Sequence, residues 1–157
     1  MKYSFAVLFL ALVSFTACKE TESKTITTEK ITFTKEGELR IHKNDSLLVQ
    51  LDIEFAETEY EVQTGLMYRD HMEEKQGMLF IFPDVSVHSF YMKNTEIPLD
   101  IIYIDENLNI ASFQENAKPF DETGLSSLVP IQYVLEVNAG LAEKWNLEVG
   151  DKITYNR

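Results

Sequence analysis

Short apolar runs separated by turn residues make up most of this chain of 157 residues, and they limit what it can fold into. In the clearest run, 47–55, apolar residues occupy every second position from Leu47 to Phe55. A period of two predicts a strand that places one face on a core and the other mostly in water. Further short apolar runs lie at 77–82, 87–94, 99–105, 108–115, 131–137 and 152–155.

Two more strands are predicted near the start of the body of the chain, at 31–34 and 38–42. The glycine of Lys35-Glu36-Gly37, between them, favours a hairpin turn at that point. The one long connection between apolar runs is 116–130. Connections of this length are uncommon in compact domains and often functional, although Asp121, Gly124, Ser126 and Ser127 fit a mobile surface loop equally well.

Helix signals occur at two places. Thr58 and Glu61 have the spacing of a capping box, in which the side chain of each residue bonds the backbone amide of the other, so a short helix is predicted there. A second short helix is predicted to be capped by Asn138 and to run through Trp145.

About nine strands and two short helices indicate a mainly β fold. We predict an antiparallel jelly-roll-like sandwich or partly closed barrel with two short helices. A parallel α/β fold is disfavoured, because parallel neighbours need a crossover of a dozen or more residues. There is no room for one between Phe82 and Glu115.

The N-terminus predicts export and lipidation. An apolar run, 5–15, follows Lys2 and precedes the single cysteine of the chain, Cys18. The run is shorter than the about 20 apolar residues that span a bilayer, so we interpret residues 1–17 as a lipoprotein signal peptide and Cys18 as the lipidation site. The alternatives are an ordinary secretory peptide and an uncleaved anchor. A flexible tether, 18–30, then leads to a single mainly β domain, 31–157.

Charge and composition limit the partners. The chain carries 14 Lys+Arg against 26 Asp+Glu, for a formal net charge of −12. Nucleic acid binding requires a basic surface, so no nucleic acid partner is expected. Membrane attachment is expected through acyl chains on Cys18 rather than through protein charge. The expected location is the bacterial cell envelope, as a lipid-anchored membrane protein facing the periplasm or the exterior.

Several motifs carry a resemblance to a known family. They are GLMYRD from Gly65, GMLFIF from Gly77, FYMKNTEIPLDIIYID from Phe90, YVLEVNAG from Tyr133 and VGD from Val149. Over about 54–155 the chain resembles the domain of unknown function 192 family. The resemblance implies a small mainly β domain of bacteria and archaea, often found behind a signal peptide. It implies no activity and no cofactor.

The resemblance singles out polar positions as candidate site residues. They are Arg69, Lys93, Asn94, Thr95, Asp100, Glu136, Asn138 and Asp151. We interpret Lys93, Asn94, Asp100 and Glu136 as meeting at one end of the fold to bind a small polar ligand or an envelope protein. The alternative is structural, with a buried ion pair and turn hydrogen bonds. Asn138 is most simply a helix cap and Asp151 a turn residue.

Catalysis has weaker support in the sequence than binding. Asp100 and Glu136 are candidates for the acid and base of a hydrolase acting on envelope carbohydrate, and this is the alternative function. No serine has the Gly-x-Ser-x-Gly context of a nucleophile. The soft ligands of a copper(I) site are present as His71, Met72, Met67, Met78, His88 and Met92. Met78 and Met92 are more simply core residues, so no metal and no cofactor are expected.

Overall fold

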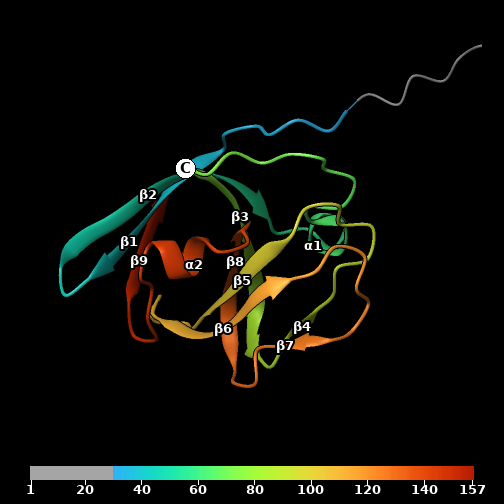
Figure 1. Ribbon diagram of the computed structural model, residues 1–157. Coiled ribbons are helices and arrows are strands. Elements are labelled where there is room, and N and C mark those ends of the chain that lie inside the picture. Colours follow the sequence, from blue (N-terminus) through green and yellow to red (C-terminus); the bar gives the residue numbers. More distant parts are fainter. Residues whose placement is uncertain (1–29) are drawn as a thin grey trace, which may run out of the picture.

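A seven-stranded mixed sheet forms most of this computed structural model, which describes residues 30–157 (Figure 1). Its strands are β1 (Gly37–Lys43), β2 (Ser46–Ala56), β3 (Gln76–Ser86), β5 (Leu99–Ile104), β6 (Ile110–Ala117), β8 (Ile131–Asn138) and β9 (Lys152–Asn156). Their order in the sheet is β6-β5-β8-β3-β2-β1-β9. Strands β4 (Ser89–Phe90) and β7 (Leu125–Ser126) form a separate two-stranded sheet.

Two short helices complete the fold, α1 (Glu59–Thr64) and α2 (Leu141–Lys144). The mainly β class with two short helices is therefore confirmed. Within the described residues no helix is long and apolar enough to cross a membrane. The predicted signal peptide 1–17, the lipidation site Cys18 and the tether up to residue 29 lie outside the described residues.

Strand pairing is antiparallel except between β2 and β3, which run parallel. The connection 57–75, which contains α1, is long enough for this one crossover. The edge strands β6 and β9 meet at an isolated bridge between Asn109 and Lys152. No continuous ladder joins them in the part of the chain that is described, so the sheet is not closed into a barrel.

The predicted hairpin around Lys35-Glu36-Gly37 is wrong. Residues 31–36 form no strand, and Gly37 is the first residue of β1. A Cβ at this position would lie 2.3 Å from the backbone oxygen of Asn156, so the glycine permits close approach of β9. The hairpin lies instead between β1 and β2, where Asn44 and Asp45 take positive φ angles of 47° and 64°.

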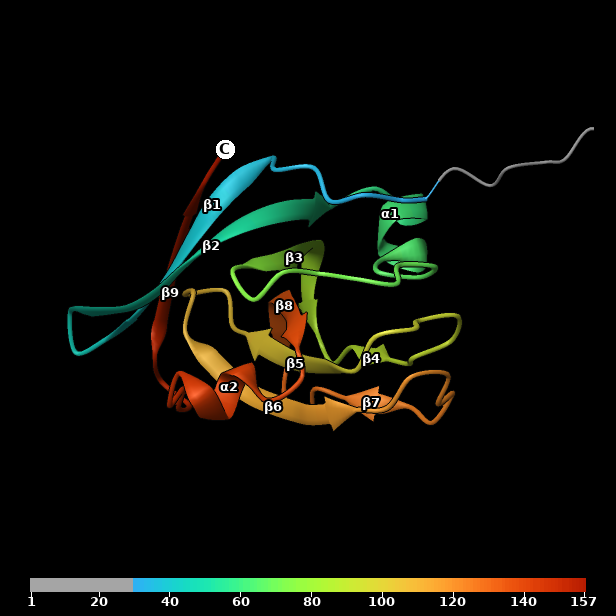
Figure 2. The ribbon, with the colours of Figure 1, turned by 45° about the horizontal axis from the view of Figure 1, so that its top comes forward.

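Two other segments differ from the predictions. Only Ser89–Phe90 of the predicted strand 87–94 is a strand, and the predicted loop 116–130 contains its partner, β7. The separate sheet made by these two short strands lies beside the α1 end of the central strands (Figure 2). Of its two strands, β4 contributes Ser89 and Phe90 to the wall of a pocket.

The predicted capping box at the start of α1 is confirmed. The Thr58 side chain accepts a hydrogen bond from the Glu61 amide, and the Glu61 carboxylate accepts one from the Thr58 amide. The helix ends at Gly65, whose φ of 46° is in the left-handed region. The second helix also exists, but Asn138 does not cap it, because α2 begins after Gly140 and Asn138 is the last residue of β8.

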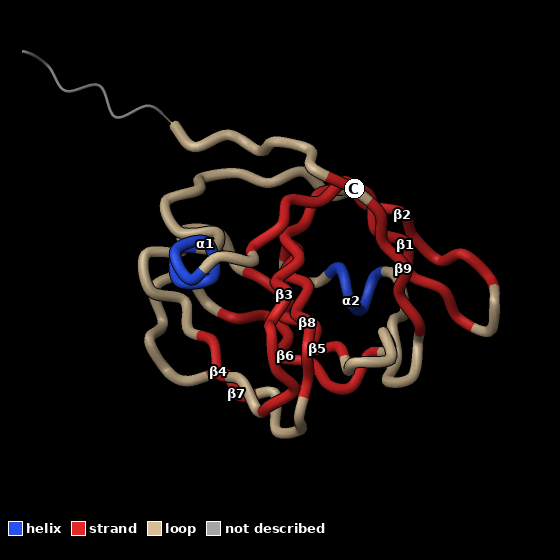
Figure 3. The backbone as a smooth tube through the Cα atoms, turned by 180° about the vertical axis from the view of Figure 1, so that it is seen from behind, coloured by secondary structure: helices blue, strands red, loops and turns tan. Residues whose placement is uncertain are grey.

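Hydrophobic cores cover both faces of the central strands β3, β8 and β5. One core contains Leu79, Ile102, Leu135, Val137 and Leu141. The other contains Phe80, Ile101, Tyr103, Val134 and Leu66. The helices lie on opposite sides of these strands, α1 with the second core and α2 with the first (Figure 3). Residues that alternate along a central strand therefore enter different cores.

Candidate functional site

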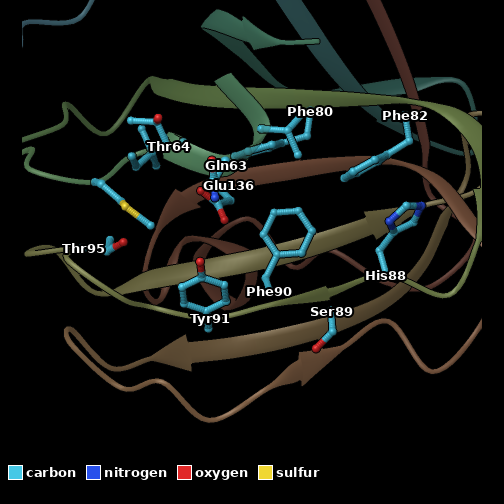
Figure 4. A pocket seen from close by; sticks show the side chains of 14 residues that line it. Gln63, Thr64, Phe80, Phe82, His88, Ser89, Phe90, Tyr91, Thr95 and Glu136 are labelled. Carbon is cyan, nitrogen blue, oxygen red and sulfur yellow. The ribbon is translucent and has the colours of Figure 1, made fainter. Parts of the chain in front are cut away.

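A pocket of about 300 Å³ lies between the C-terminal end of α1, strand β3 and strand β4 (Figure 4). One wall is the segment from Val62 to Met67, in which the chain leaves the helix at Gly65. The opposite wall comes from His88 to Tyr91, and Thr95 closes one end. A concave and largely apolar site of this size is typical of a small-molecule site.

Aromatic rings pack against one another in the pocket walls. The Phe80 and Phe90 rings meet edge to face, with centroids 5.2 Å apart and an interplanar angle of 88°. The His88 ring stacks on Phe82 at 3.8 Å, and its Nε2 lies 3.0 Å from the Ser86 hydroxyl. Packing of this kind fixes the side-chain positions before any ligand arrives.

Glu136 is the acidic side chain of this pocket. It lies on β8 between Met78 of β3 and Ile101 of β5, with their side chains on the same face of the sheet. The residue is 5% exposed, and no hydrogen bond to its carboxyl occurs within residues 30–157. Burial raises the pKa of Glu136 from 4.5 to about 8, because the charged form loses hydration. Figure 4 shows the carboxyl pointing into the same space as the Tyr91 hydroxyl.

The predicted polar cluster is only partly brought together. Thr95 and Glu136 line the pocket, whereas Lys93 is exposed outside it. Asn94 has a φ of 55°, and its Nδ2 donates to the Tyr68 hydroxyl at 2.8 Å. Asn94 therefore acts as a turn residue that holds the two loops together, as the structural alternative expects.

Asp100 lies on the opposite face of the sheet from Glu136. It pairs with Val137, the residue next to Glu136 on β8, so its side chain enters the other core. Its Oδ1 accepts a hydrogen bond from the Asn116 amide and its Oδ2 accepts one from the Ala142 amide, both at 2.9 Å. The expectation that Asp100 and Glu136 meet is therefore wrong, and the two carboxyls do not form an acid and base pair.

Arg69 is part of a buried ion pair. Its Nη2 lies 2.8 Å from Glu54 Oε2, and the two side chains are 9% and 8% exposed. Glu54 Oε1 also accepts a hydrogen bond from the Thr34 amide at 2.9 Å. Both residues line a second pocket of about 250 Å³, which shares Thr64 and Gly65 with the first. A buried ion pair of this kind is the structural role that the sequence left open for the candidate set.

The last two candidates position loops. Asn138 Nδ2 donates to the backbone oxygen of Met72 at 2.7 Å, which fixes the segment that leads into β3. Asp151 Oδ2 accepts a hydrogen bond from the Glu148 amide at 2.8 Å, as expected of a turn residue. In the described part of the chain, no group of three His, Cys, Asp or Glu residues is placed to hold a metal ion.

Most residues of the pocket were missed by sequence reasoning. Phe80, Phe82 and Phe90 were assigned only to apolar runs, and an apolar run does not distinguish a core residue from a pocket wall. Gln63 and Thr64 belong to a short helix with no signal of function. Of the pocket residues, Glu136 carried a signal that the sequence could show. A single carboxylate inside the apolar run 131–137 loses hydration when it is buried, and such a residue is often part of a functional site.

Comparisons with known proteins show to which family this chain is similar. The family model DUF192, described as Uncharacterized ACR, matches residues 40–155. A UPF0127 protein of Pyrococcus furiosus is 25% identical over 114 residues, covering 69% of this chain and 90% of the relative.

Two crystal structures share the fold. A protein of unknown function from Novosphingobium aromaticivorans has a TM-score of 0.71 and 33% identity, covering 74% of this chain and 83% of its own. A Sinorhizobium meliloti protein described as a candidate transcription regulator has a TM-score of 0.73 and 33% identity, covering 76% of this chain and 92% of its own.

The role of Asp100 is tested by replacing it with asparagine. We expect Asp100→Asn to lower the free energy of unfolding by about 1 to 3 kcal/mol, because the new amide group cannot accept from both backbone N–H groups. Chemical denaturation measures the change, with Asp84→Asn on the exposed end of β3 as the control. Unchanged stability of the Asp100 variant would contradict the structural role.

The burial of Glu136 predicts a pH dependence of stability. Its pKa is raised in the folded state, so its contribution is most favourable at low pH and is lost as the pH rises from 4.5 to about 8. Glu136→Gln cannot ionise, so it should gain stability relative to the native chain over this range, on the order of 4 kcal/mol in total. Unfolding free energies measured from pH 4 to 9 check this, with exposed Glu122→Gln as the control. A constant difference would refute the burial effect.

Proposed function

This chain belongs to the DUF192 family of uncharacterised proteins, and from that premise we propose that it is a non-catalytic binding module of the bacterial cell envelope. Its domain binds a small molecule in the pocket between α1 and β4. The ligand has an apolar body that fits the aromatic walls and one polar group that reaches Glu136. Acyl chains on Cys18 hold the protein at the membrane.

The observation that carries this proposal is the carboxyl of Glu136, which faces a largely apolar pocket and accepts no hydrogen bond from residues 30–157. Burial makes the charged form of this carboxyl unfavourable, which raises its pKa from 4.5 to about 8. Such a shift is typical of functional sites, where a ligand supplies the missing partner. The edge-to-face packing of Phe80 and Phe90 supports the same conclusion, because a rigid wall is ready to receive a ligand.

Binding is favoured over hydrolysis by the position of Asp100. Glycoside hydrolysis uses two carboxyl groups that flank one bond. The second carboxylate of the sequence hypothesis is bound to the backbone amides of Asn116 and Ala142 on the other side of the sheet. Among the described residues, Glu136 is left as the single carboxyl that lines the pocket.

The envelope location rests on the sequence before the described domain. The apolar run and the single Cys18 have the order of a lipoprotein signal. The described chain begins at Lys30, which pairs with Asp70 in the loop after α1. Lys30 therefore lies beside the loop that follows α1, the helix that borders the pocket.

Ligand binding is tested with a neutral aromatic probe, benzyl alcohol, added to the mature chain from residue 18 with Cys18 replaced by serine to keep it in solution. We expect saturable amide chemical-shift changes at the pocket, centred on Leu66, Phe90 and Glu136. Ser89→Trp places a large ring in the pocket wall and should weaken binding at least fivefold. Ser46→Trp, at an exposed site on β2, should not. Shifts scattered over the surface, or equal effects of the two variants, would count against the pocket.

Lipidation is tested by growing cells that express the full chain with radiolabelled palmitate. We expect the native protein to carry the label and to sediment with membranes, and Cys18→Ser to lose the label. Ser23→Ala, in the tether, is the matched control and should keep it. An unlabelled native protein in the soluble fraction would remove the anchor from the proposal.

A further inference from the structure

We infer that the pocket binds an ammonium group carried on a compact apolar body, with the carboxylate of Glu136 as its counter-charge. This inference rests on the proposed function and names the class of ligand.

Glu136 is the exception among the buried acidic residues of the described chain, which are Glu54, Asp100, Glu136 and Asp151. Glu54 is paired with Arg69, and Asp100 accepts hydrogen bonds from two backbone amides. Asp151 accepts one from the Glu148 amide and lies 3.8 Å from Lys43 Nζ. The fold thus supplies partners for three of its buried carboxylates, whereas the fourth faces the pocket.

The walls of the pocket favour a cation. The described residues that line it include no lysine and no arginine, but they include the rings of Phe80, Phe82, Phe90 and Tyr91. Aromatic faces attract cations through the negative charge of their π systems. The chain as a whole carries a net charge of −12, which also attracts cations to its surface.

Other classes of ligand satisfy this site less well. An anion would place its charge near the Glu136 carboxyl, and the described walls supply no lysine or arginine to balance it. A neutral acceptor would bind the proton of the acid but would leave the second oxygen without a donor. An ammonium group has several N–H donors, so it can bond both oxygens and direct its remaining charge at the rings.

Binding of a cation also changes the protonation of Glu136. When the acid is protonated, an alkylammonium binds by displacing that proton to solvent, which leaves a carboxylate and ammonium pair in the pocket. Affinity should therefore rise with pH up to about 8, where the carboxyl ionises without help. The other titratable groups that face this space are His88 and Tyr91 in the wall and Tyr103 on β5, whose pKa is raised by burial and by the charge of Glu136.

The test compares benzylamine, benzyl alcohol and benzoate, which carry one ring and differ in charge, on the same mature chain followed by amide chemical shifts. At pH 8 we expect benzylamine to bind at least tenfold more tightly than benzyl alcohol, and benzoate to bind most weakly. At pH 6 the affinity for benzylamine should be more than tenfold lower than at pH 8. Glu136→Gln should reduce the affinity for benzylamine at least tenfold, whereas Glu96→Gln, at an exposed site beside Thr95, should retain it.

Each result decides between the two proposals. Equal or tighter binding of benzyl alcohol in the pocket would overturn the ammonium inference and leave the proposed function in place. Tightest binding by benzoate would also overturn the inference. If no probe saturates the pocket, both proposals fail. The comparison of probes and of pH values uses the native side chains, so it remains decisive if the Glu136 variant does not fold.

Discussion

The covering of β3, β8 and β5 on both faces is the constraint on which the rest of the structure depends. Because side chains alternate along a strand, each polar residue in the buried middle of these strands must enter one core or the other. Asp100 enters the core beside α2, where two backbone amides bind it. Glu136 enters the core beside α1, where the fold leaves a pocket. The same rule therefore makes one carboxylate structural and leaves the other facing the pocket.

The free energy of this arrangement links stability to function. Burial without hydrogen bonds raises the pKa of Glu136, so the folded chain is penalised for ionising it at neutral and alkaline pH. A ligand that pairs with the carboxylate would offset this cost and would stabilise the folded state in proportion to its concentration. Natural binding sites commonly reduce stability in this way, because they keep polar groups ready for a partner.

The sequence predicted the features that depend on local chemistry. The capping box of Thr58 and Glu61 and the buried strand Leu99–Ile104 were both readable, because hydrogen-bonding spacing and apolar runs are local signals. Features that are set by contacts between residues far apart in the sequence were not predicted. Gly37 was predicted to lie in a turn, but it permits the close approach of β9. Asn138 was predicted to cap a helix, but its side chain donates a hydrogen bond to the backbone oxygen of Met72. The separation of Asp100 from Glu136 depends on strand register, which no local pattern contained.

The central claim is that the Glu136 carboxyl is buried, unpaired and open to the pocket. It is tested most directly by a ¹³C NMR titration of the Glu136 side-chain carboxyl in the ligand-free mature chain, assigned by its loss in Glu136→Gln. The account predicts a midpoint near pH 8, with the exposed glutamates titrating at ordinary values. A midpoint near 4.5 would show a solvated or paired carboxyl and would contradict the account.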